Sequence, residues 1–329
     1  MTPGIGWPGC YGCGVRLRDV GEFALIDRIE RAVRRAGPVR GVVLGIGDDA
    51  ALLRLRTGED LAASTDAFVE DVHFRFESEA PRAIGRRAIA AALSDLAAMG
   101  ARPLGVLAAL AAPPTLPLAL AEGITSGLLD GARRWHAPLV GGNVARARQT
   151  SLTLTVLGAV RRGRALTRAN ARPGDRLFVT GTLGGAALAV ARAARGGRVR
   201  VAPEPRLFAG QSLARLRGVG ACIDVSDGLV ADLGHLLRSS RVGAEVDPTR
   251  IPRPPGFAAA CARVGVDPLR LALAGGEDYE LLFTLRPSAA TAASLRRRLG
   301  VAVTEIGAIT ADPGLRGIPQ HVRRGFAHF

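Results

Sequence analysis

The sequence predicts an α/β or α+β protein built from two domains. Its 329 residues are more than one hydrophobic core comfortably accommodates, so two domains are expected. Short apolar runs of strand length alternate with longer segments in which apolar residues recur at helical spacing. Hydrophobic residues make up 48% of the chain and charged residues 22%, which is typical of an ordinary globular protein.

The first half opens with a helix followed by short strands. Leu25, Ile29 and Val33 recur at helical spacing and predict a helix over residues 24–36. Three apolar runs are too short for helices and predict strands, at residues 41–46, 50–55 and 60–65.

A long alanine-rich helix is the clearest element of the chain. It covers residues 81–99, and Gly100 is its C-terminal stop. The elements that follow are a strand at 104–112, a helix at 116–135, a strand at 137–140 that ends in Gly141-Gly142-Asn143, and a strand at 150–160. The last of these alternates polar and apolar residues, which predicts that one of its faces is exposed.

The second half repeats the order of strand, turn and helix. Its expected strands cover residues 177–180, 221–225, 244–246, 279–285 and 301–309. Its expected helices cover 186–195, 208–216, 227–239, a short stretch within 253–264, and 288–299.

The linker between the domains is expected at residues 161–174, which include Pro173-Gly174. This division predicts a loose tail over 1–20, an N-terminal domain over 21–162 and a C-terminal domain over 163–329.

Seven of the 29 carboxylates occur in four short clusters where an apolar run ends beside Gly or Ser. The clusters are Gly47-Asp48-Asp49, Ser64-Thr65-Asp66, Asp224-Val225-Ser226-Asp227-Gly228 and Gly275-Gly276-Glu277-Asp278. Such positions place oxygen ligands beside backbone N–H groups, and this combination holds Mg²⁺ and phosphates. A single Asp-Gly is usually a turn or a helix cap, but four clusters together favour a site for more than one ion.

One further carboxylate, Asp95, stands alone in the alanine-rich helix between Leu93 and Leu96. Burying a carboxylate there is costly unless a positive charge meets it. Asp95 is therefore a candidate metal ligand as well.

Lysine is absent, so all 44 basic residues are arginine. A Walker-type phosphate loop, a Schiff-base lysine and a Ser-x-x-Lys nucleophile are therefore excluded. Histidine is scarce, and no Ser-His-Asp or Cys-His arrangement has a recognisable spacing. Phosphoryl chemistry in this chain must depend on metal ions, arginine and backbone amides.

The glycine-rich segment at residues 181–185 lies between an expected strand and an expected helix. It has two interpretations that the sequence leaves open. It could bind phosphate at the helix N-terminus, or it could be a tight packing turn.

The formal net charge of +15 would be compatible with a protein that binds nucleic acid. However, the arginines are spread from Arg16 to Arg324 and no aromatic residues interleave with them as stacking platforms. No nucleic-acid partner is therefore expected. No apolar run is long enough for a signal peptide or a membrane span, so no membrane partner is expected and the cytoplasm is the default location.

The four cysteines give no sign of a zinc site or of an oxidising compartment. Cys10 and Cys13 form a single C-x-x-C without a second pair of ligands. Cys222 and Cys261 stand among apolar residues and are expected in the core.

From about residue 20 to the end, the chain resembles the thiamine-monophosphate kinase family in a specific and ordered set of motifs. These are Gly-Glu-Phe at 21–23, Gly-Ile-Gly-Asp-Asp at 45–49, Ser-Thr-Asp at 64–66, Val-His-Phe at 72–74, Leu-Ser-Asp-Leu-Ala-Ala-Met-Gly at 93–100, Val-Gly-Gly-Asn at 140–143, Leu-Thr-Arg at 166–168, Val-Thr-Gly-Thr-Leu-Gly at 179–184, Ile-Asp-Val-Ser-Asp-Gly-Leu at 223–229 and Gly-Gly-Glu-Asp-Tyr-Glu-Leu at 275–281.

The resemblance implies the two-domain aminoimidazole-ribonucleotide synthetase-like fold. In that fold an N-terminal α/β domain pairs with its twin in a homodimer, and a C-terminal α/β domain closes the active site. The implied reaction transfers the γ-phosphate of ATP to thiamine monophosphate, giving thiamine diphosphate and ADP by direct in-line transfer. The implied cofactors are several Mg²⁺ ions, and a monovalent cation is compatible with the family.

The resemblance also implies roles for individual residues. Magnesium ligands are implied at Asp49, Ser64, Thr65, Asp66, Asp95, Asn143, Asp224 and Asp227. Contacts to the nucleotide are implied at Trp135, Gly142, Asn143, Arg168 and Ser226, and contacts to thiamine at His73, Glu277 and Phe326. Asn143 stands where many relatives have Asp. No general base is expected, because a phosphate whose second pKa is near 6 is already anionic at neutral pH.

Two alternatives remain. The segment Gly-Cys-Tyr-Gly-Cys-Gly at 9–14 resembles the reactive N-terminal segment of selenophosphate synthetase, an enzyme of the same superfamily, although the lysine expected there is absent. The other alternative is a basic nucleic-acid-binding protein, which steep salt-dependent DNA binding without magnesium would favour.

Overall fold

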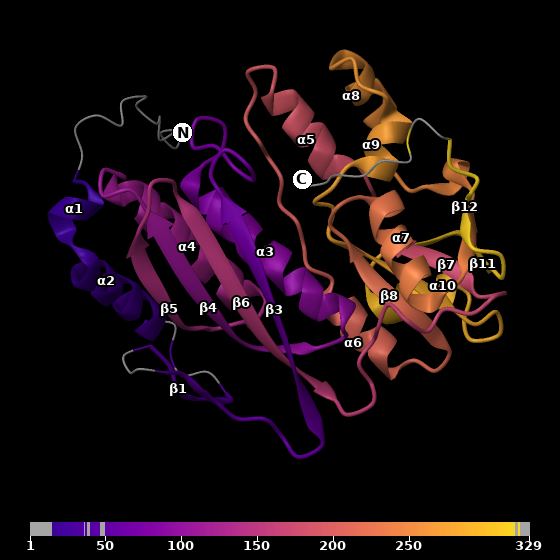
Figure 1. Cartoon of the computed structure of the whole chain (residues 1–329), viewed down its shortest axis with the longest axis horizontal. Coiled ribbons are helices and arrows are strands. Elements are labelled where there is room, and N and C mark those ends of the chain that lie inside the picture. Colours follow the sequence, from indigo (N-terminus) through magenta and orange to yellow (C-terminus); the bar gives the residue numbers. More distant parts are fainter. Residues whose placement is uncertain (1–14, 36, 38–39, 47–49, 320–321, 323–329) are drawn as a thin grey trace, which may run out of the picture.

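The computed structural model describes residues 15–35, 37, 40–46, 50–319 and 322 (Figure 1). Asp49, Phe326, Cys10 and Cys13 lie outside these residues, so the predictions made for them stay predictions. Of the helices within the described ranges, none is both long enough and apolar enough to cross a membrane.

The N-terminal part is built on a four-stranded mixed sheet. Its elements are α1 (Leu17–Val20), α2 (Glu22–Arg34), β1 (Val42–Leu44), β2 (Leu52–Leu53), β3 (Glu59–Val69), α3 (Pro81–Ala98), β4 (Arg102–Ala112), α4 (Leu118–Arg134), β5 (Leu139–Arg146) and β6 (Ser151–Arg161). The strand order is β3-β6-β4-β5, in which only β4 and β5 are parallel, and β1 and β2 form a separate small pair.

The helices α3 and α4 lie side by side on one face of this sheet (Figure 1). Glycine permits their close approach, because a Cβ on Gly127 would lie 2.0 Å from the carbonyl oxygen of Arg82. On the opposite face of the sheet, side chains such as Leu61, Thr65 and Ala109 are exposed. We call this the open face of the sheet.

The C-terminal part is built on a six-stranded mixed sheet with helices on both faces (Figure 1). Its elements are β7 (Arg176–Thr180), α5 (Gly185–Ala193), α6 (Leu207–Arg215), β8 (Val219–Val225), α7 (Leu229–Ser240), β9 (Gly243–Val246), the 3₁₀ helix η1 (Pro248–Arg250), α8 (Phe257–Arg263), α9 (Pro268–Ala274), β10 (Glu280–Leu285), α10 (Ala292–Leu299), β11 (Val303–Thr310) and β12 (Gly314–Arg316). The strand order is β12-β9-β11-β7-β10-β8, and only β12 and β9 are parallel. Cys222 and Cys261 are buried in its core, as the sequence predicted.

The two parts meet where the C-terminal half of α3 packs against α6 (Figure 1). A Cβ on Gly210 would lie 1.9 Å from the carbonyl oxygen of Ala97, so only glycine permits this contact. Gly100 has a φ of +67° and ends α3 as the sequence predicted. The packing places Asp95, near the end of α3, at the junction of the two parts.

Three local predictions were wrong. Residues 15–20 are not a loose tail, because they contain α1 and the N–H of Leu17 donates to the carbonyl of Leu116 at 3.0 Å. The strand expected at 137–140 continues as β5 through Gly141-Gly142-Asn143, because its parallel ladder with β4 runs on to Arg146. The sequence also missed α9 and β12.

Candidate active site

A cleft of about 700 Å³ lies between the two parts. Four of the aspartates singled out in the sequence line it, namely Asp66 on β3, Asp95 on α3, and Asp224 and Asp227 at the end of β8. The cleft brings together aspartates that are up to 161 positions apart in the chain, from Asp66 to Asp227. Their convergence was expected, whereas their role as metal ligands stays a prediction.

Strand alternation decides which residues of Ser64-Thr65-Asp66 face the cleft. The hydroxyl of Ser64 donates to the carboxylate of Asp95, which places Ser64 on the side of α3. Thr65 points to the open face, where its hydroxyl lies 3.2 Å from that of Thr155. The hydroxyl of Thr65 therefore does not reach the acidic cleft of its own chain, and the prediction of this side chain as a ligand there needs correction.

Burial and mutual repulsion both disfavour ionisation of Asp66 and Asp224. Burial, and then the charge of Asp95, raises the pKa of Asp66 to about 6. Burial, followed by the charges of Asp95 and Asp66, raises the pKa of Asp224 to about 7, although Ser94 donates to Asp224 at 2.7 Å. Concentrated negative charge of this kind is stabilised by a bound cation.

The pKa of Asp95 is raised as well. Burial is the main cause, while the hydrogen bond from Ser64 and the positive charge of Arg168 act in the opposite direction. Arg168 is exposed and its charge acts on this end of the cleft, where the resemblance implies a phosphate contact.

The donor set fits Mg²⁺. Carboxylate and hydroxyl oxygens are the hard ligands that this ion prefers, and it is usually held by one or two carboxylates together with water and substrate phosphates. In the ranges that the structure describes, no three Asp, Glu, His or Cys side chains are close enough to enclose an ion by themselves.

The turn that carries Asp224 and Asp227 is held by Asp232, a residue that sequence reasoning missed. Its carboxylate accepts hydrogen bonds from the backbone N–H groups of Ser226 and Asp227, both at 3.0 Å. Burial, and then the charges of Asp224 and Asp227, raises the pKa of Asp232 to about 7. The available signal was its position in the first turn of α7, where acidic residues bind free N–H groups.

On the predicted thiamine side, His73 and Glu277 both line the cleft. The ring of His73 stacks on Phe68 with centroids 5.2 Å apart, and its Nδ1 accepts a hydrogen bond from the N–H of Val69 at 3.1 Å. Arg87, which sequence reasoning also missed, lines the same cleft and forms an ion pair with Glu277 at 2.6 Å.

The glycine-rich segment at 181–185 is a packing turn. The carboxylate of Asp278 accepts hydrogen bonds from the N–H groups of Gly184 at 2.6 Å and Ala186 at 3.3 Å. The N-terminus of α5 is thereby already occupied by a negative group of the chain itself. Of the two interpretations left open, phosphate binding at this segment is not supported.

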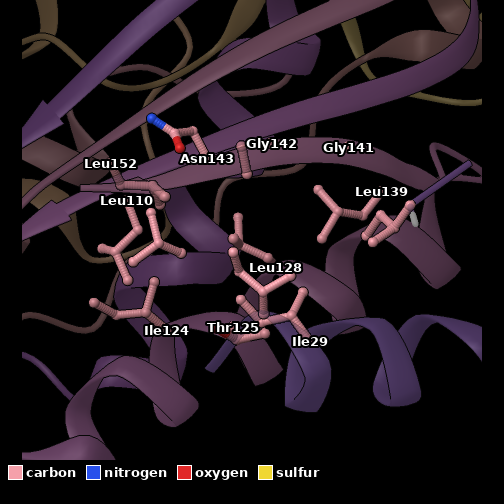
Figure 2. A pocket seen from close by; sticks show the side chains of 14 residues that line it. Ile29, Leu110, Ile124, Thr125, Leu128, Leu139, Gly141, Gly142, Asn143 and Leu152 are labelled. Atoms are coloured by element: carbon pink, nitrogen blue, oxygen red, sulfur yellow. The ribbon is translucent and has the colours of Figure 1, made fainter. Parts of the chain in front are cut away.

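The predicted nucleotide contacts are divided between two places. Ser226 lines the cleft, whereas Gly142 and Asn143 lie on β5 and line an apolar pocket of about 80 Å³ (Figure 2). The side chains of Leu110, Ile124 and Leu128 gather in this pocket, while Asn143 projects away from them (Figure 2).

Trp135 lies in neither place. Its side chain is only 7% exposed, and its indole N–H donates to Glu204 at 2.8 Å. Among the described residues that line the cleft or the apolar pocket, Trp135 does not occur. The structure therefore does not support the predicted contact between Trp135 and a nucleotide.

Comparison with known proteins gives the same two-part division. Residues 47–160 match the family profile of the AIR synthase related protein, N-terminal domain, and residues 172–319 match that of the C-terminal domain. The thiamine-monophosphate kinase of Escherichia coli strain K12 is 40% identical over 310 residues, which cover 89% of this chain and 91% of that protein.

Solved structures agree. The thiamine-monophosphate kinase from Stenotrophomonas maltophilia K279a superposes with a TM-score of 0.78 at 37% identity, covering 90% of this chain and 96% of that one. The structure described as AaThiL complexed with AMPPCP and TMP has a TM-score of 0.75 at 29% identity, covering 96% and 99%. This chain belongs to the thiamine-monophosphate kinase family of AIR synthase related proteins.

Proposed function

We propose that this chain transfers the γ-phosphate of ATP to thiamine monophosphate in the presence of Mg²⁺, giving thiamine diphosphate and ADP. The observation that carries the proposal is the convergence of Asp66, Asp95, Asp224 and Asp227 on one cleft, where burial and repulsion raise the pKa values of Asp66 and Asp224. A relative with the same fold is described as complexed with AMPPCP and TMP, which are of the substrate classes that this reaction requires.

The proposed metal ligands are the acidic and polar groups around the cleft. They are Asp49, Ser64, Asp66, Asp95, Asp224 and Asp227, with Asn143 and the backbone of Thr65 as further candidates. Bound Mg²⁺ would neutralise the charge of the two anionic substrates. A monovalent cation remains compatible with such a site.

The remaining residues orient the substrates. Arg168 can grip a phosphate with two N–H groups, which a lysine could not do. The acceptor phosphate is already anionic at neutral pH, so the cleft requires alignment of the reacting groups rather than a general base. Ser226 is proposed to contact the nucleotide, and His73, Glu277 and Phe326 are proposed to contact thiamine.

The apolar pocket beside Gly142 is the proposed site of the nucleotide base (Figure 2). Its aliphatic lining suits a flat heteroaromatic ring. The missing side chain of Gly142 serves the packing of β5 against β4, because a Cβ there would lie 1.9 Å from the carbonyl oxygen of Ala108. This placement replaces the one expected at Trp135.

We further propose that the chain acts as a homodimer through the open face of the N-terminal sheet. Leu61 on this face is 54% exposed, and β3 and β5 form the two opposite edges of the sheet. Asn143 on β5 is therefore separated from Asp66 on β3 by two strands of the same chain. Packing two open faces about a two-fold axis would bring β5 of one protomer next to β3 of its partner. Light scattering that gives the mass of a monomer would refute the dimer.

In this proposal, residues 21–162 bind ATP and Mg²⁺ and form the dimer, while residues 163–329 close the active site. The cytoplasm, where both substrates would be available, is the proposed location.

The test is an assay of the purified protein with ATP, Mg²⁺ and thiamine monophosphate. We expect ADP release that depends on both Mg²⁺ and thiamine monophosphate, with thiamine diphosphate formed in equal amount. ADP release that does not depend on thiamine monophosphate, or no turnover at all, would contradict the proposal. Salt-dependent DNA binding without Mg²⁺ would favour the alternative of a nucleic-acid-binding protein.

A further inference from the structure

A buried arginine on α3 joins the two walls of the cleft. The side chain of Arg87 is 2% exposed. Its Nη2 lies 2.6 Å and its Nε 3.0 Å from the carboxylate of Glu79, while its Nη1 lies 2.6 Å from that of Glu277. Nη2 also donates to the carbonyl of His73 at 2.5 Å, and the guanidinium lies 4.9 Å from the ring centroid of Phe68. We call Glu79, Arg87 and Glu277 the triad.

The two glutamates of the triad differ in position. Glu79 has a side chain that is 1% exposed and belongs to the same wall as Arg87. Glu277 has a side chain that is 23% exposed, comes from the opposite wall and lines the cleft. One guanidinium therefore serves two carboxylates, and the triad keeps one excess negative charge when all three groups are ionised.

The charges of the triad depend on each other. Burial alone would lower the pKa of Arg87, but the charges of Glu277 and Glu79 outweigh burial and raise it. Burial also raises the pKa of Glu79, and Arg87 acts against that rise. The buried guanidinium is thus held ionised by both carboxylates.

The loop that carries Glu277 has a backbone that needs external support. Glu277 and Tyr279 have φ angles of 66° and 51°, which non-glycine residues rarely adopt. The N–H of Glu277 donates to the carbonyl of Ser226 at 2.7 Å, next to the proposed ligand Asp227. Strained residues of this kind persist where the surroundings fix them, and Arg87 supplies the contact from the opposite wall.

We propose that Arg87 is a positioning residue that holds Glu277 across the cleft, and that the triad selects an acceptor with a cationic ring. The inference rests on the proposed function, because the thiazolium ring of thiamine monophosphate is a permanent cation. The excess negative charge of the triad attracts that cation, and the fixed carboxylate of Glu277 defines where it lies. Arginine is needed because its planar fork contacts two carboxylates at once, whereas lysine offers a single charged point.

The test compares Arg87→Lys and Arg87→Met with the wild type in steady-state assays. We expect the KM for thiamine monophosphate to rise about tenfold in Arg87→Lys and further in Arg87→Met, because Glu277 loses its fixed partner. The KM for ATP should change less than twofold. Thiamine without phosphate, used as a competitive inhibitor, should lose affinity in parallel, because the affected contact is with the ring.

A double variant separates the loss of the contact to Glu277 from misfolding caused by an unpaired buried charge. Arg87→Met leaves Glu79 buried without a partner, so the double variant Arg87→Met/Glu79→Gln removes that charge as well. It should fold and still show the raised KM for thiamine monophosphate. In a double-mutant cycle, Arg87→Met and Glu277→Gln should be non-additive in kcat/KM for this substrate.

The matched control is Arg206→Met, because Arg206 forms a comparable pair with Glu280 at 2.5 Å outside the cleft. It should lower thermal stability without a selective change in the KM for thiamine monophosphate. Equal effects on both substrates, additivity with Glu277→Gln, or a KM within twofold of wild type in Arg87→Lys would overturn the inference. Failure of the wild type to use thiamine monophosphate would instead overturn the proposed function.

Discussion

Two groups of carboxylates in the cleft are held in opposite ways. In the first group, Asp66, Asp95 and Asp224, which we call the aspartate cluster, burial raises every pKa, and the charge of Asp95 raises the pKa values of Asp66 and Asp224 further. In the second group, Glu277 forms an ion pair with Arg87 across the cleft at 2.6 Å. The first arrangement favours a cation from solution, whereas the second contains a cation of the chain itself. This difference fits the proposed roles, in which the aspartate cluster binds exchangeable metal and the triad holds a fixed carboxylate for recognition.

The largest effect is expected from removing one carboxylate of the aspartate cluster. Asp224→Asn should reduce turnover by at least about a hundredfold, because a proposed ligand and its charge are lost together. In the absence of Mg²⁺ at pH 8, the same variant should melt at a higher temperature than the wild type, since a buried and repelled charge is gone. Measurement of ADP release and of Tm without metal checks both effects.

Asp130→Asn is the matched control for that variant. Asp130 pairs with Arg82 at 2.5 Å on the surface, away from the cleft, so its loss should leave turnover unchanged. Near-normal turnover in Asp224→Asn would refute the assignment of Asp224 as a ligand. A fall in its metal-free Tm would refute the electrostatic account of the aspartate cluster.

The second effect concerns pH. Asp66 and Asp224 have pKa values of about 6 and about 7 in the folded chain, above the ordinary value of 3.8. The folded state therefore binds more protons than the unfolded state between pH 3.8 and 7, and the stability of the metal-free protein should fall as pH rises through 6 and 7. Because Mg²⁺ needs the ionised carboxylates, the increase in Tm caused by Mg²⁺ should be small at pH 5.5 and large at pH 8.

Differential scanning fluorimetry with and without Mg²⁺ at both pH values measures this linkage. Asp224→Asn should reduce the dependence on pH, since one of the two shifted groups is removed. An equal gain in Tm at pH 5.5 and pH 8 would show that protons and Mg²⁺ do not compete for these carboxylates.

The sequence predicted the elements that carry the aspartates because their signals are local. The helix of Asp95 has an alanine-rich apolar pattern and ends at Gly100, and α3 was found within one residue of its expected bounds. Asp224 lies near the end of an apolar run of strand length, which is β8. Both residues were recognisable as candidate ligands because burying a carboxylate within or directly after an apolar segment is costly unless a positive charge meets it.

The partners that complete the site could not be predicted in this way. Arg87 and Glu277 are 190 positions apart, and an arginine in a helix usually faces solvent. The carboxylate of Asp278 occupies the N-terminus of α5, which is 92 to 94 positions away, and this contact decides between two interpretations that the glycine-rich segment left open. The continuation of β5 through two glycines likewise depends on pairing with β4, because glycine weakens a strand in isolation.

The smallest effect is expected from Ser94→Ala, which changes the surroundings of the aspartate cluster without removing a carboxylate. Ser94 is fully buried and donates to Asp224 at 2.7 Å, and this hydrogen bond favours the ionised form that a metal requires. Its loss should raise the Mg²⁺ concentration for half-maximal activity by roughly three- to tenfold. Turnover at saturating Mg²⁺ should stay close to that of the wild type, because all proposed ligands remain. Ser126→Ala is the control, since the Ser126 hydroxyl donates to the carbonyl of Glu122 on an exposed part of α4. An unchanged Mg²⁺ requirement in Ser94→Ala would mean that the hydrogen bond from Ser94 does not assist metal binding by Asp224. The aspartates would then differ more strongly from the triad, in which Arg87 fixes the position of Glu277.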